Sequence, residues 1–541
     1  MKKIMMAACL LFLALTAMAV ERKIKVTQRY LNFPIAQNVE RQKMRITEEK
    51  NELCNFVVRL TEGQPQYWVF QDVSPWKGRT ITLHYEGNVA ALNSIIMADS
   101  IVGGSQIYKE QERPKYHYTP RCGWMNDPNG LIYYNGQYHM FYQYNPYERD
   151  WENMHWGHAV STDMVHWQEW PEALHPDSIG TAFSGTAVVD WQNTSRFAKR
   201  TKEPALVAIY TADHPASERQ CLAYSTDGGY TFSKYTHNPI IDSSKRWQSH
   251  DTRDPKVFWY APTSQWVMVL HERDGHSIYT SPNLKQWTYE SHIPGFWECP
   301  ELFELPVEGT NQRLWVMWGA SGTYVLGHFD GHQFKPISNK QLNMIGSGYA
   351  AQTFNSMPAD DNRVVKMTWG RIRFDNTSFN GVMLLPQEQV LKQTSQGIKL
   401  FSRPVKEVKQ LCKPIFTAQE KMSVEKANEL LRPYAEKKQL RIKATLRLTY
   451  ATDAGLEYQG DRLVTYDTNS NMLNGQFYTP DNPTPMTITL DVYIDNSIIE
   501  GFIDDGALSF SKKHHTSNHN GYSFFGKETI IEKLEIYDVS L

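Results

Sequence analysis

Three acidic motifs carry the side chains of this chain that are best suited to acid–base chemistry. Asp127 stands in the run Trp-Met-Asn-Asp-Pro-Asn-Gly, Asp254 in Arg-Asp-Pro, and Glu298 in Trp-Glu-Cys-Pro. A proline follows each acid within two residues and fixes the backbone where a strand ends. Hydrolysis of a glycosidic bond needs one carboxylate that attacks or activates water and a second carboxyl group that gives a proton to the leaving oxygen. The three motifs together therefore predict a site of this kind.

The sequence neighbours of the acids suggest a division of roles. Asp127 lies beside polar turn amides and is expected to stay ionised. Glu298 has aromatic residues and Cys299 as neighbours, and an apolar setting favours a carboxyl group that keeps its proton, as a general acid must. Arg253 favours an ionised Asp254, which suits the binding of sugar hydroxyls better than proton transfer.

Each motif alone also has an ordinary structural explanation. Asp-Pro commonly closes a turn, an adjacent arginine and aspartate commonly form a surface ion pair, and a strand-end glutamate is commonly satisfied by hydrogen bonds. Glu301 is an alternative general acid, because it too stands beside apolar residues. The combination of three motifs, more than any one of them, favours catalysis.

Composition narrows the class of ligand. The 541 residues include 56 Lys plus Arg and 58 Asp plus Glu, a net charge of −2. A chain with this net charge lacks the positive electrostatic potential that binds nucleic acid or an anionic membrane, so the expected ligand is neutral. Aromatic residues make up 13% of the chain, which suits both β-structure and stacking against sugar rings and does not choose between them.

The first 19 residues have the pattern of a secretory signal peptide. Two lysines precede an apolar run, and Ala17-Met18-Ala19 offers a small-x-small cleavage site. The chain is therefore expected to be exported, to the periplasm or outside the cell. A lipoprotein is the weaker alternative, since Cys9 comes early in the apolar run. No later stretch is long and apolar enough to span a membrane, and the five remaining cysteines show no disulfide framework.

Alternating apolar and polar residues predict an all-β chain with three domains after the signal peptide. Residues 20–111 read as a small N-terminal β-sandwich-like accessory domain, and residues 401–541 as a C-terminal β-sandwich. Helical periodicity is plausible only between Ser423 and Lys437, where Pro433 interrupts it. The turn Asp504-Asp505-Gly506 is expected to separate two strands.

A weak repeat occupies the middle of the chain, residues 112–400. The turns that begin at Ser161, Ser225 and Ser281 each combine Ser, Asp or Asn, and a closing aromatic residue, and a fainter fourth begins at His328. This spacing suits four-stranded blades with irregular loops and predicts a five-bladed β-propeller as the catalytic domain. Residues far apart in sequence would then meet near its axis.

In combination, these motifs resemble glycoside hydrolase family 32, the invertases, inulinases and levanases. The resemblance runs from about Pro114 to the C-terminus and also includes Tyr-Gln-Tyr-Asn-Pro (142–146), Phe-Ser-Gly-Thr-Ala (183–187) and Phe-Ser-Arg-Pro (401–404). It implies a five-bladed propeller followed by a β-sandwich. It also implies release of fructose from β-D-fructofuranosides such as levan, inulin or sucrose, with retention and without a cofactor or metal.

The resemblance assigns roles to residues of this chain. Asp127 would be the nucleophile, Glu298 the general acid/base, and Asp254 the residue that holds fructose hydroxyls in the transition state. The residues at matching positions that would line the fructose pocket are Asn126, Gln143, Trp151, Phe183, Ser184 and Arg253.

Two departures from the family pattern are visible. Ser347-Gly348-Tyr349-Ala350 stands where an Asp-Phe-Tyr-Ala is frequent, and Pro386-Gln387-Glu388 where Pro-Arg-Glu is common. The first lies near the expected pocket rim, so β2,1 or β2,6 linkage preference does not follow from the resemblance.

Alternatives from other classes remain open. An inverting enzyme of the arabinanase type also places three acids on a five-bladed propeller, and a non-catalytic fructan-binding protein would use the same pocket without chemistry. Exo action is favoured, because the segments 147–156 and 211–220 carry bulky or charged residues such as Trp151 and would wall a closed funnel. The histidines at 155, 158 and 166 are weak metal candidates, and those at 514, 515 and 519 are expected in a solvated loop.

Overall fold

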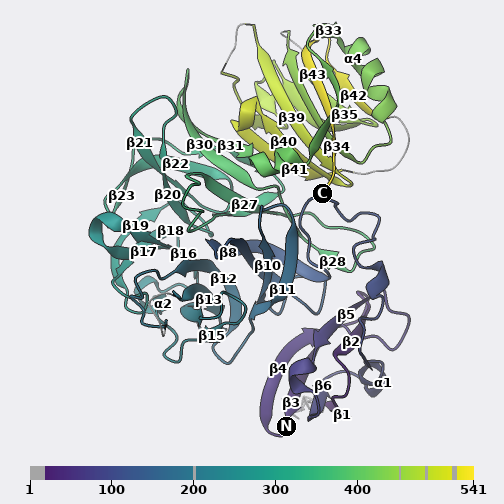
Figure 1. The fold of residues 1–541 in the computed structure, drawn as a ribbon, viewed down its shortest axis with the longest axis vertical. Coiled ribbons are helices and arrows are strands. Elements are labelled where there is room, and N and C mark those ends of the chain that lie inside the picture. The colour runs from purple at the N-terminus through teal and green to yellow at the C-terminus, as the bar shows by residue number, and fades with distance from the viewer. Residues whose placement is uncertain (1–18, 199–202, 450–452, 482–484, 515–520) are drawn as a thin grey trace, which may run out of the picture. The chain divides into compact units, whose positions relative to one another are not determined.

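The computed structural model describes residues 19–198, 203–449, 453–481, 485–514 and 521–541. These segments consist mainly of strands and turns (Figure 1), which confirms the all-β prediction. The predicted signal peptide falls on residues 1–18, outside the described residues, apart from Ala19. Within the described part of the chain, no helix combines the length and the apolar character needed to cross a bilayer.

The chain divides into two compact units, and the first ends at Ser105. This unit holds two antiparallel sheets over a core that includes Phe33, Ile46 and Leu83. Apolar residues of β3 point inward while Lys43 and Arg45 are exposed, which is the alternation of a half-buried strand. The strands are β1 (Val20–Lys25), β6 (Thr80–Tyr85), β3 (Gln42–Glu48) and β4 (Asn51–Val58) in one sheet, and β5 (Tyr67–Asp72), β2 (Tyr30–Ile35) and β7 (Ile96–Ala98) in the other, with helix α1 (Val89–Asn93) beside them.

The second unit begins with five antiparallel sheets that follow one another along the chain. In Figure 1 their colours run from blue through teal to green. Their main strands, sheet by sheet, are β8 (Gly123–Tyr134), β9 (Gln137–Asn145), β10 (His155–Ser161) and β11 (Trp167–Leu174); β12 (Thr181–Val189), β13 (Leu206–Asp213), β14 (Arg219–Ser225) and β15 (Ser233–Lys234); β16 (Thr252–Tyr260), β17 (Gln265–Glu272), β18 (Gly275–Ser281) and β19 (Thr288–Pro294); β20 (Glu301–Pro306), β21 (Arg313–Trp318), β22 (Thr323–Phe329) and β23 (Phe334–Pro336); and β26 (Gly348–Thr353), β27 (Val364–Gly370), β30 (Gln387–Thr394) and β31 (Gly397–Pro404).

Short elements complete these five sheets. Strand β28 runs parallel to β8 and joins the last segment of the series to the first sheet. The short elements are β28 (Phe379–Asn380), β29 (Val382–Met383), β24 (Gln341–Leu342) and helix α2 (Ser244–Trp247).

The repeated turns noted in the sequence have equivalent positions in the first four sheets, because each joins the third strand to the fourth. The fourth residue of the first three turns has a left-handed backbone, with φ of 64° at Met164, 83° at Gly228 and 65° at Leu284. Trp167 and Trp287 each donate an indole hydrogen bond to the carbonyl of that residue, at 2.9 and 3.0 Å. In these two turns the closing tryptophan therefore fixes the backbone, with its ring partly buried.

The first strands of four of these sheets pack against one another. Strand β12 contacts both β8 and β16, and β8 also contacts β26. Residues at the same end of these strands therefore come together even when they are more than a hundred positions apart in the sequence.

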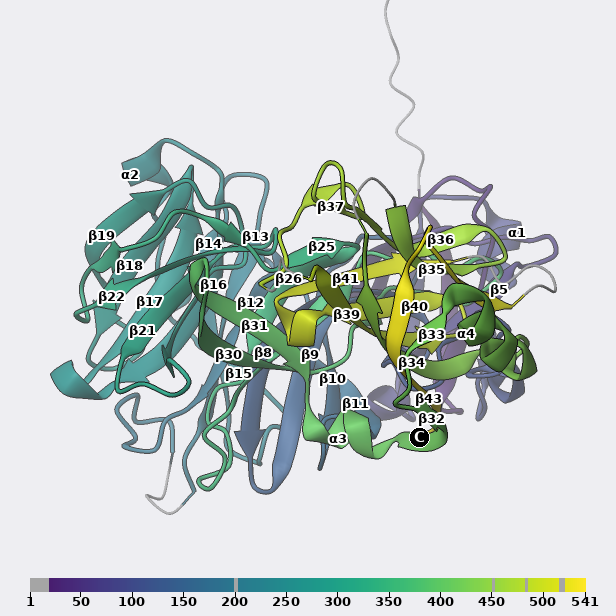
Figure 2. The same cartoon turned by 90° about the horizontal axis from the view of Figure 1, so that it is seen from above.

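The remainder of the second unit is also built from sheets, drawn in yellow-green and yellow in Figure 1. Strand β25 runs parallel to β41, so a segment that precedes the fifth sheet pairs with this region (Figure 2). The strands are β25 (Met344–Gly346), β41 (Leu508–Lys513), β40 (Ile498–Ile503), β39 (Thr487–Asp495), β34 (Gln439–Arg447), β43 (Ile530–Val539), β32 (Cys412–Ala418) and β33 (Met422–Ser423) in one sheet, and β38 (Gln476–Phe477), β37 (Met472–Leu473), β36 (Asp461–Asp467), β35 (Asp453–Tyr458) and β42 (Tyr522–Phe525) in the other, with helices α3 (Lys406–Gln410) and α4 (Val424–Leu431).

Two local predictions are confirmed here. Helix α4 lies in the predicted helical segment; Ser423 caps its N-terminus by accepting a hydrogen bond from the amide of Lys426, and a 3₁₀ turn containing Pro433 follows it. The Asp504-Asp505-Gly506 turn separates β40 from β41. One expectation is wrong: His514 is buried, with its Nε2 at 2.7 Å from the carbonyl of Asn496. His515 and His519 lie outside the described residues.

A buried imidazole connects the segment before β8 to strands β39 and β40. His117 is fully buried, with Nδ1 at 2.9 Å from Asp495 and Nε2 at 3.1 Å from Glu500. Burial disfavours the imidazolium, but the hydrogen bonds and charges of the two carboxylates outweigh it and raise the pKa of His117 to about 9. Glu500 also accepts hydrogen bonds from the amide of Leu385 and the side chain of Gln387. Gln387, which stands where Pro-Arg-Glu has arginine, therefore belongs to this network.

We expect this network to make stability depend on pH. The pKa of His117 is higher in the folded state than its ordinary value near 6.5, so its contribution is complete below about pH 6.5 and is lost as pH rises through about 9. His117→Gln should lower the free energy of unfolding by about 3 kcal/mol at pH 6, because it leaves two buried carboxylates without their cation. Denaturant titrations at pH 6 and pH 9.5 measure this, and an equal loss at both values would contradict it.

Candidate active site

The first strands of three sheets carry β-bulges at residues that the sequence singled out. The register against the neighbouring strand shifts at Asp127 in β8, at Phe183 and Ser184 in β12, and at Asp254 in β16. A bulge leaves one residue out of the ladder and turns its side chain away from the regular alternation. Each bulge can therefore direct a polar side chain toward the same point.

Glu298 reaches this point differently, from the turn before β20. Its φ is 48° and that of Cys299 is 43°, while Asp254 has a φ of 63°. A non-glycine residue in the left-handed region costs on the order of 1 kcal/mol or more. Here the amide of Ala320 holds the turn by donating to the carbonyls of Trp297 and Glu298 at 3.0 and 3.1 Å. The backbone is thus held in this conformation where the acid is needed.

Asp127 and Asp254 meet at the thiol of Cys299. Its sulfur lies 3.6 Å from Asp127 Oδ2 and 3.5 Å from Asp254 Oδ2, and its amide donates to Asp254 Oδ2 at 3.0 Å. Asp127 also accepts hydrogen bonds from the Ser184 hydroxyl at 2.7 Å and the Asn126 amide at 3.1 Å. Both carboxylates are therefore oriented by fixed donors.

Glu298 is held by a guanidinium and a phenol. Arg253 donates to Glu298 Oε1 from Nη2 at 3.0 Å and from Nε at 3.2 Å, and the Tyr349 hydroxyl donates to Oε2 at 2.6 Å. The glutamate side chain is 24% exposed. The sequence predicted apolar surroundings for Glu298. This prediction is wrong, because the backbone turn directs the carboxylate toward polar groups.

Two family profiles match this chain. The profile "Glycosyl hydrolases family 32 N-terminal domain" matches residues 117–404, and "Glycosyl hydrolases family 32 C terminal" matches residues 407–538. The chain belongs to glycoside hydrolase family 32. The matched regions contain the five consecutive sheets and the sheets that follow them, so the resemblance inferred from the acidic motifs is confirmed.

Relatives within family 32 act on fructose polymers according to their names. A levanase of Bacillus subtilis is 46% identical over 331 residues, which cover 56% of this chain and 48% of the levanase. An extracellular exo-inulinase of Meyerozyma guilliermondii is 41% identical over 286 residues, which cover 48% of this chain and 54% of that protein. The chain thus spans about half the length of these two relatives. The crystal structure of an exo-inulinase from Aspergillus awamori superimposes with a TM-score of 0.71 at 27% identity, covering 80% of this chain and 99% of that one.

Burial has the largest influence on the protonation of the two aspartates in this family 32 site. Burial raises the pKa of Asp127, although its hydrogen bonds from Ser184 and Asn126 oppose the rise. Burial and the neighbouring Asp127 charge raise the pKa of Asp254 to about 8, against the opposing effect of Arg253. Arg253 was expected to keep Asp254 ionised, but burial outweighs its charge and the pKa of Asp254 rises instead. The expectation that Asp127 is the ionised carboxylate of the site stays a prediction.

Two of the predicted pocket residues, Asn126 and Ser184, donate hydrogen bonds to Asp127, and the others lie on β9, β12, β16 and the loop after β9. Asn126 accepts a hydrogen bond from the Trp124 indole at 2.8 Å, and the buried Gln143 donates to the carbonyl of Ala182 at 2.9 Å. Phe183 packs edge-on against Trp151, whose side chain is 47% exposed. Gln143 thus supports the bulge that carries Ser184, while Trp151 presents a ring to solvent.

Glu301, the alternative general acid, is buried in an ion pair with Lys256. It is 1% exposed, lies 3.0 Å from the ammonium of Lys256, and accepts a hydrogen bond from the Thr353 hydroxyl at 2.5 Å. Lys256 also donates to the carbonyl of Thr353 at 2.7 Å. This ion pair joins β16, β20 and β26, so Glu301 is engaged in packing between the sheets.

Three residues of the site were not identified as functional from the sequence. Tyr349 lies in the motif that departs from the family pattern, and this departure was the available signal. Cys299 was noted only as an apolar neighbour. Glu218 gave no signal, because it stands in the loop between β13 and β14 and approaches Arg253 only through the packing of two sheets.

The site also contains groups with metal-ligand chemistry. Asp127, Asp254 and Cys299 place their ligand atoms within 4.8 Å of one another. Burial raises the pKa of the Cys299 thiol well above its usual value, so the thiol stays neutral and is a poor ligand. The three histidines considered from the sequence have separate environments: His155 contacts the carbonyl of Asn153, His158 contacts His139 at 3.1 Å, and His166 pairs with Asp163 at 2.7 Å.

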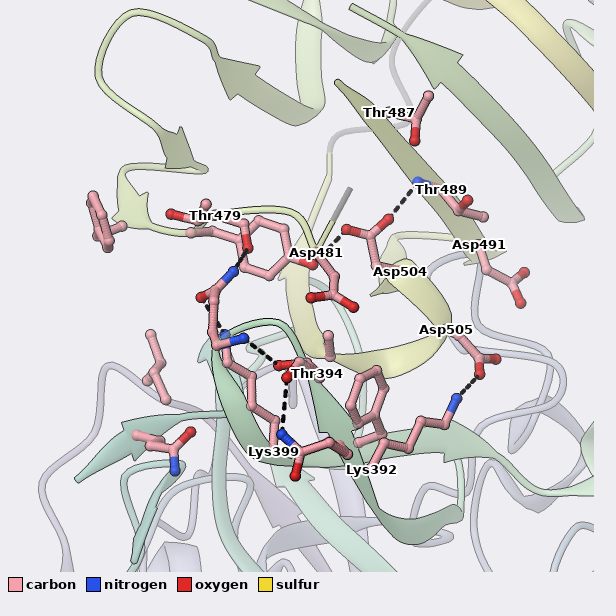
Figure 3. Close-up of a pocket in the computed structure, with 18 of the residues that line it drawn as sticks. Lys392, Thr394, Lys399, Thr479, Asp481, Thr487, Thr489, Asp491, Asp504 and Asp505 are labelled. Atoms are coloured by element: carbon pink, nitrogen blue, oxygen red, sulfur yellow. Dashed lines mark hydrogen bonds and ion pairs between the residues drawn. The ribbon is translucent and has the colours of Figure 1, made fainter. Parts of the chain in front are cut away.

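A cavity of about 520 Å³ lies elsewhere in the second unit (Figure 3), lined by parts of β30, β31 and β39 among others. Its carboxylates have structural partners. Asp504 accepts from the Tyr478 hydroxyl at 2.6 Å and the Thr489 amide at 2.7 Å, and Asp505 pairs with Lys392 at 2.8 Å. The three predicted catalytic acids are not among its described lining residues.

We expect Asp254→Asn to stabilise the fold increasingly as pH rises. The folded pKa of Asp254, about 8, exceeds its ordinary value of 3.8, so the folded state binds the proton more tightly and loses stability between about pH 4 and pH 8. Asparagine removes this cost. The melting temperature of Asp254→Asn should exceed that of the wild type by about 2–4 °C at pH 8 and by less at pH 5.

The matched control for this comparison is Asp227→Asn, an exposed aspartate that accepts a hydrogen bond from the Ser225 hydroxyl at 2.7 Å. It should show no such gain on raising the pH from 5 to 8. A difference between Asp254→Asn and wild type that is independent of pH would refute the assignment of a burial-raised pKa.

Proposed function

We propose that this chain is a retaining β-fructofuranosidase that releases fructose from fructans such as levan or inulin, and from sucrose. The observation that carries the proposal is the convergence of Asp127, Asp254 and Glu298 around Cys299 and Arg253. Membership of family 32 and the names of its relatives support the same substrate class.

In the proposed first step, Asp127 attacks the anomeric carbon of the terminal fructose. A bond forms between its carboxylate oxygen and that carbon while the glycosidic carbon–oxygen bond breaks, and the leaving oxygen takes the proton of Glu298. Ser184 and Asn126 hold the attacking carboxylate. In the second step Glu298 removes a proton from water, water attacks the same carbon, and the bond to Asp127 breaks.

Asp254 would bind the hydroxyl groups of fructose. Its raised pKa permits it to carry a proton at neutral pH, so it can donate a hydrogen bond as well as accept one. Such bonds accelerate the reaction where they tighten as the ring flattens toward the transition state.

The proposed architecture is a five-bladed propeller over residues 112–400 followed by a β-sandwich over residues 401–541, with an accessory β-sandwich-like domain over residues 20–111. Five consecutive antiparallel sheets, the packing of their first strands and the equivalent turns support the propeller. Bulged first strands would then place the acids around the axis.

Export to the periplasm or the medium is proposed on two grounds. Residues 1–19 have the composition of a signal peptide, and the inulinase relatives are described as extracellular. A neutral polysaccharide is too large to enter a cell intact, so hydrolysis outside the cytoplasm fits the proposed substrate.

Exo action is proposed because two loops beside the acids are held in place. Asn145 donates to the carbonyl of Asp150 at 2.8 Å in the loop that carries Trp151. The second loop, between β13 and β14, is tied by a contact of 3.1 Å between His250 and the carbonyl of His214. Fixed loops at the rim favour a pocket that admits one chain end.

Stereochemistry separates the proposal from an inverting enzyme. With methanol as the acceptor, a retaining enzyme transfers fructose to give the methyl β-fructofuranoside, whereas the α-anomer would indicate direct displacement. NMR of the first product distinguishes them. Fructan binding without release of either product would instead support the non-catalytic alternative.

We expect Asp127→Asn and Glu298→Gln each to lower kcat by several orders of magnitude without loss of folding. Both changes keep the shape of the side chain and remove a nucleophile or an acid. Steady-state kinetics on sucrose and circular dichroism measure the two quantities. The control is Asp330→Asn, an exposed aspartate on the fourth repeated turn; activity within tenfold of wild type in either catalytic variant would overturn the assignment.

The order of product release tests the exo mechanism. Free fructose should appear from the first minutes of digestion of levan or inulin, while the average polymer length falls slowly. Chromatography of early time points measures both. Early accumulation of fructo-oligosaccharides without proportionate fructose would indicate an open cleft.

A further inference from the structure

A buried carboxylate on the second sheet shares the guanidinium that holds Glu298. Glu218 is 4% exposed and stands in the loop between β13 and β14. Arg253 belongs to β16 in the third sheet, and Glu298 precedes β20 in the fourth. One carboxylate–guanidinium–carboxylate chain therefore crosses three sheets.

The guanidinium uses different nitrogens for its two sides. Arg253 Nη1 donates to both oxygens of Glu218, at 3.1 and 3.0 Å, and to Asp251 at 2.8 Å. Its Nε and Nη2 both donate to Glu298 Oε1. Since one positive charge serves these carboxylates, a charge on Glu218 reduces the electrostatic stabilisation left for the ionised form of Glu298.

Glu218 itself has a fixed position. Its Oε2 accepts the backbone amide of Thr252 at 2.8 Å, and His250 Nδ1 lies 3.9 Å from its Oε1. Asp213 lies close to the same pair of side chains. Burial raises the pKa of Glu218, opposed by the charge of Arg253 and the Thr252 amide. The titratable groups that face it are therefore Arg253, His250 and Asp213.

Glu298 has its own set of neighbours. Arg253 and Tyr349 contact it directly, and the charges of Asp127, Asp254 and His271 interact with it. The negative charge of Glu218 disfavours the ionised form of Glu298, whereas the charge of Arg253 favours it, and the two effects add.

We propose that Glu218 is a positioning residue that keeps Glu298 protonated, and thus competent as a general acid, at higher pH than Arg253 alone would allow. The proposal rests on the proposed function, because it assigns Glu298 the role of proton donor. It goes beyond that function by assigning a role to a residue that need not touch the substrate.

The direction of the effect on removing Glu218 follows from charge. In Glu218→Gln the negative charge that opposes ionisation of Glu298 is removed while the charge of Arg253 stays, so the ionised form of Glu298 becomes more favourable. The alkaline limb of the kcat/KM profile, which requires the protonated acid, should move by about one pH unit to lower pH, as expected for one nearby charge at an effective dielectric constant of ~20–40. The amide can still accept from Arg253 and Thr252, so binding and KM at low pH should change little.

The experiment compares Glu218→Gln with wild type on sucrose and on an aryl fructoside with a good leaving group, over pH 4–9. The alkaline limb should move on sucrose, whereas bond cleavage in the aryl fructoside needs little acid assistance and should lose no more than about threefold in kcat. Coincident profiles on sucrose would overturn the proposal. Equal losses on the two substrates at all pH values would also overturn it, since they would indicate a general structural defect.

Two further variants control for folding and for charge. Glu218→Ser also removes the charge and should move the limb in the same direction; if Glu218→Gln does not fold, an unchanged limb in this variant overturns the proposal. Asp251→Asn removes another partner of the same nitrogen, but Asp251 is 42% exposed, so solvent screening should make its shift smaller than that of Glu218→Gln. A wild-type protein that hydrolyses no fructoside would refute the proposed function itself. An active wild-type enzyme whose profile is not shifted in Glu218→Gln would refute only the role of Glu218.

Discussion

The interaction on which the site depends is the sharing of Arg253 among carboxylates that repel one another. Its guanidinium contacts Glu218, Asp251 and Glu298 directly, and its charge also acts on Asp254. The guanidinium remains charged across the pH range in which the protein works. It can therefore offset part of the repulsion at all times, while the protons on the surrounding acids account for the rest.

Backbone irregularity brings these acids together. In a regular strand, successive side chains alternate between the two faces of the sheet, and an acid at the strand end would follow that alternation. Bulges at Asp127 and Asp254, and the left-handed turn at Glu298, break it. The regular ladders on either side and the buried Lys256–Glu301 pair supply the rigidity that makes these local distortions tolerable.

The sequence predicted the features that depend on local pattern. Alternation predicted the strands, the Ser-Asp-aromatic turns were found at equivalent joins, and three short motifs led to the correct family. It did not predict the charge environment, because Arg253 is adjacent to Asp254 in sequence but directs its guanidinium at Glu298 and Glu218. The His117 network was not predicted either, for the same reason. Its carboxylates lie more than 370 positions away and meet the imidazole only after folding. Burial, which sets the pKa of Asp254, is likewise a property of the packed sheets.

The charge networks around His117 and around Arg253 differ in how well their charges match. His117 stands between two carboxylates that also accept several backbone amides, so the charges there are largely satisfied and the network serves stability. Around Arg253, one guanidinium faces three carboxylates directly and the two aspartates next to Cys299 lie close by. If all five acids were ionised, the excess negative charge would be strongly unfavourable, above all at the buried Asp254 and Glu218. Some of them must therefore keep a proton at neutral pH. A hydrolase of this type requires that condition, since a protonated acid beside an ionised nucleophile is the starting state of the proposed reaction.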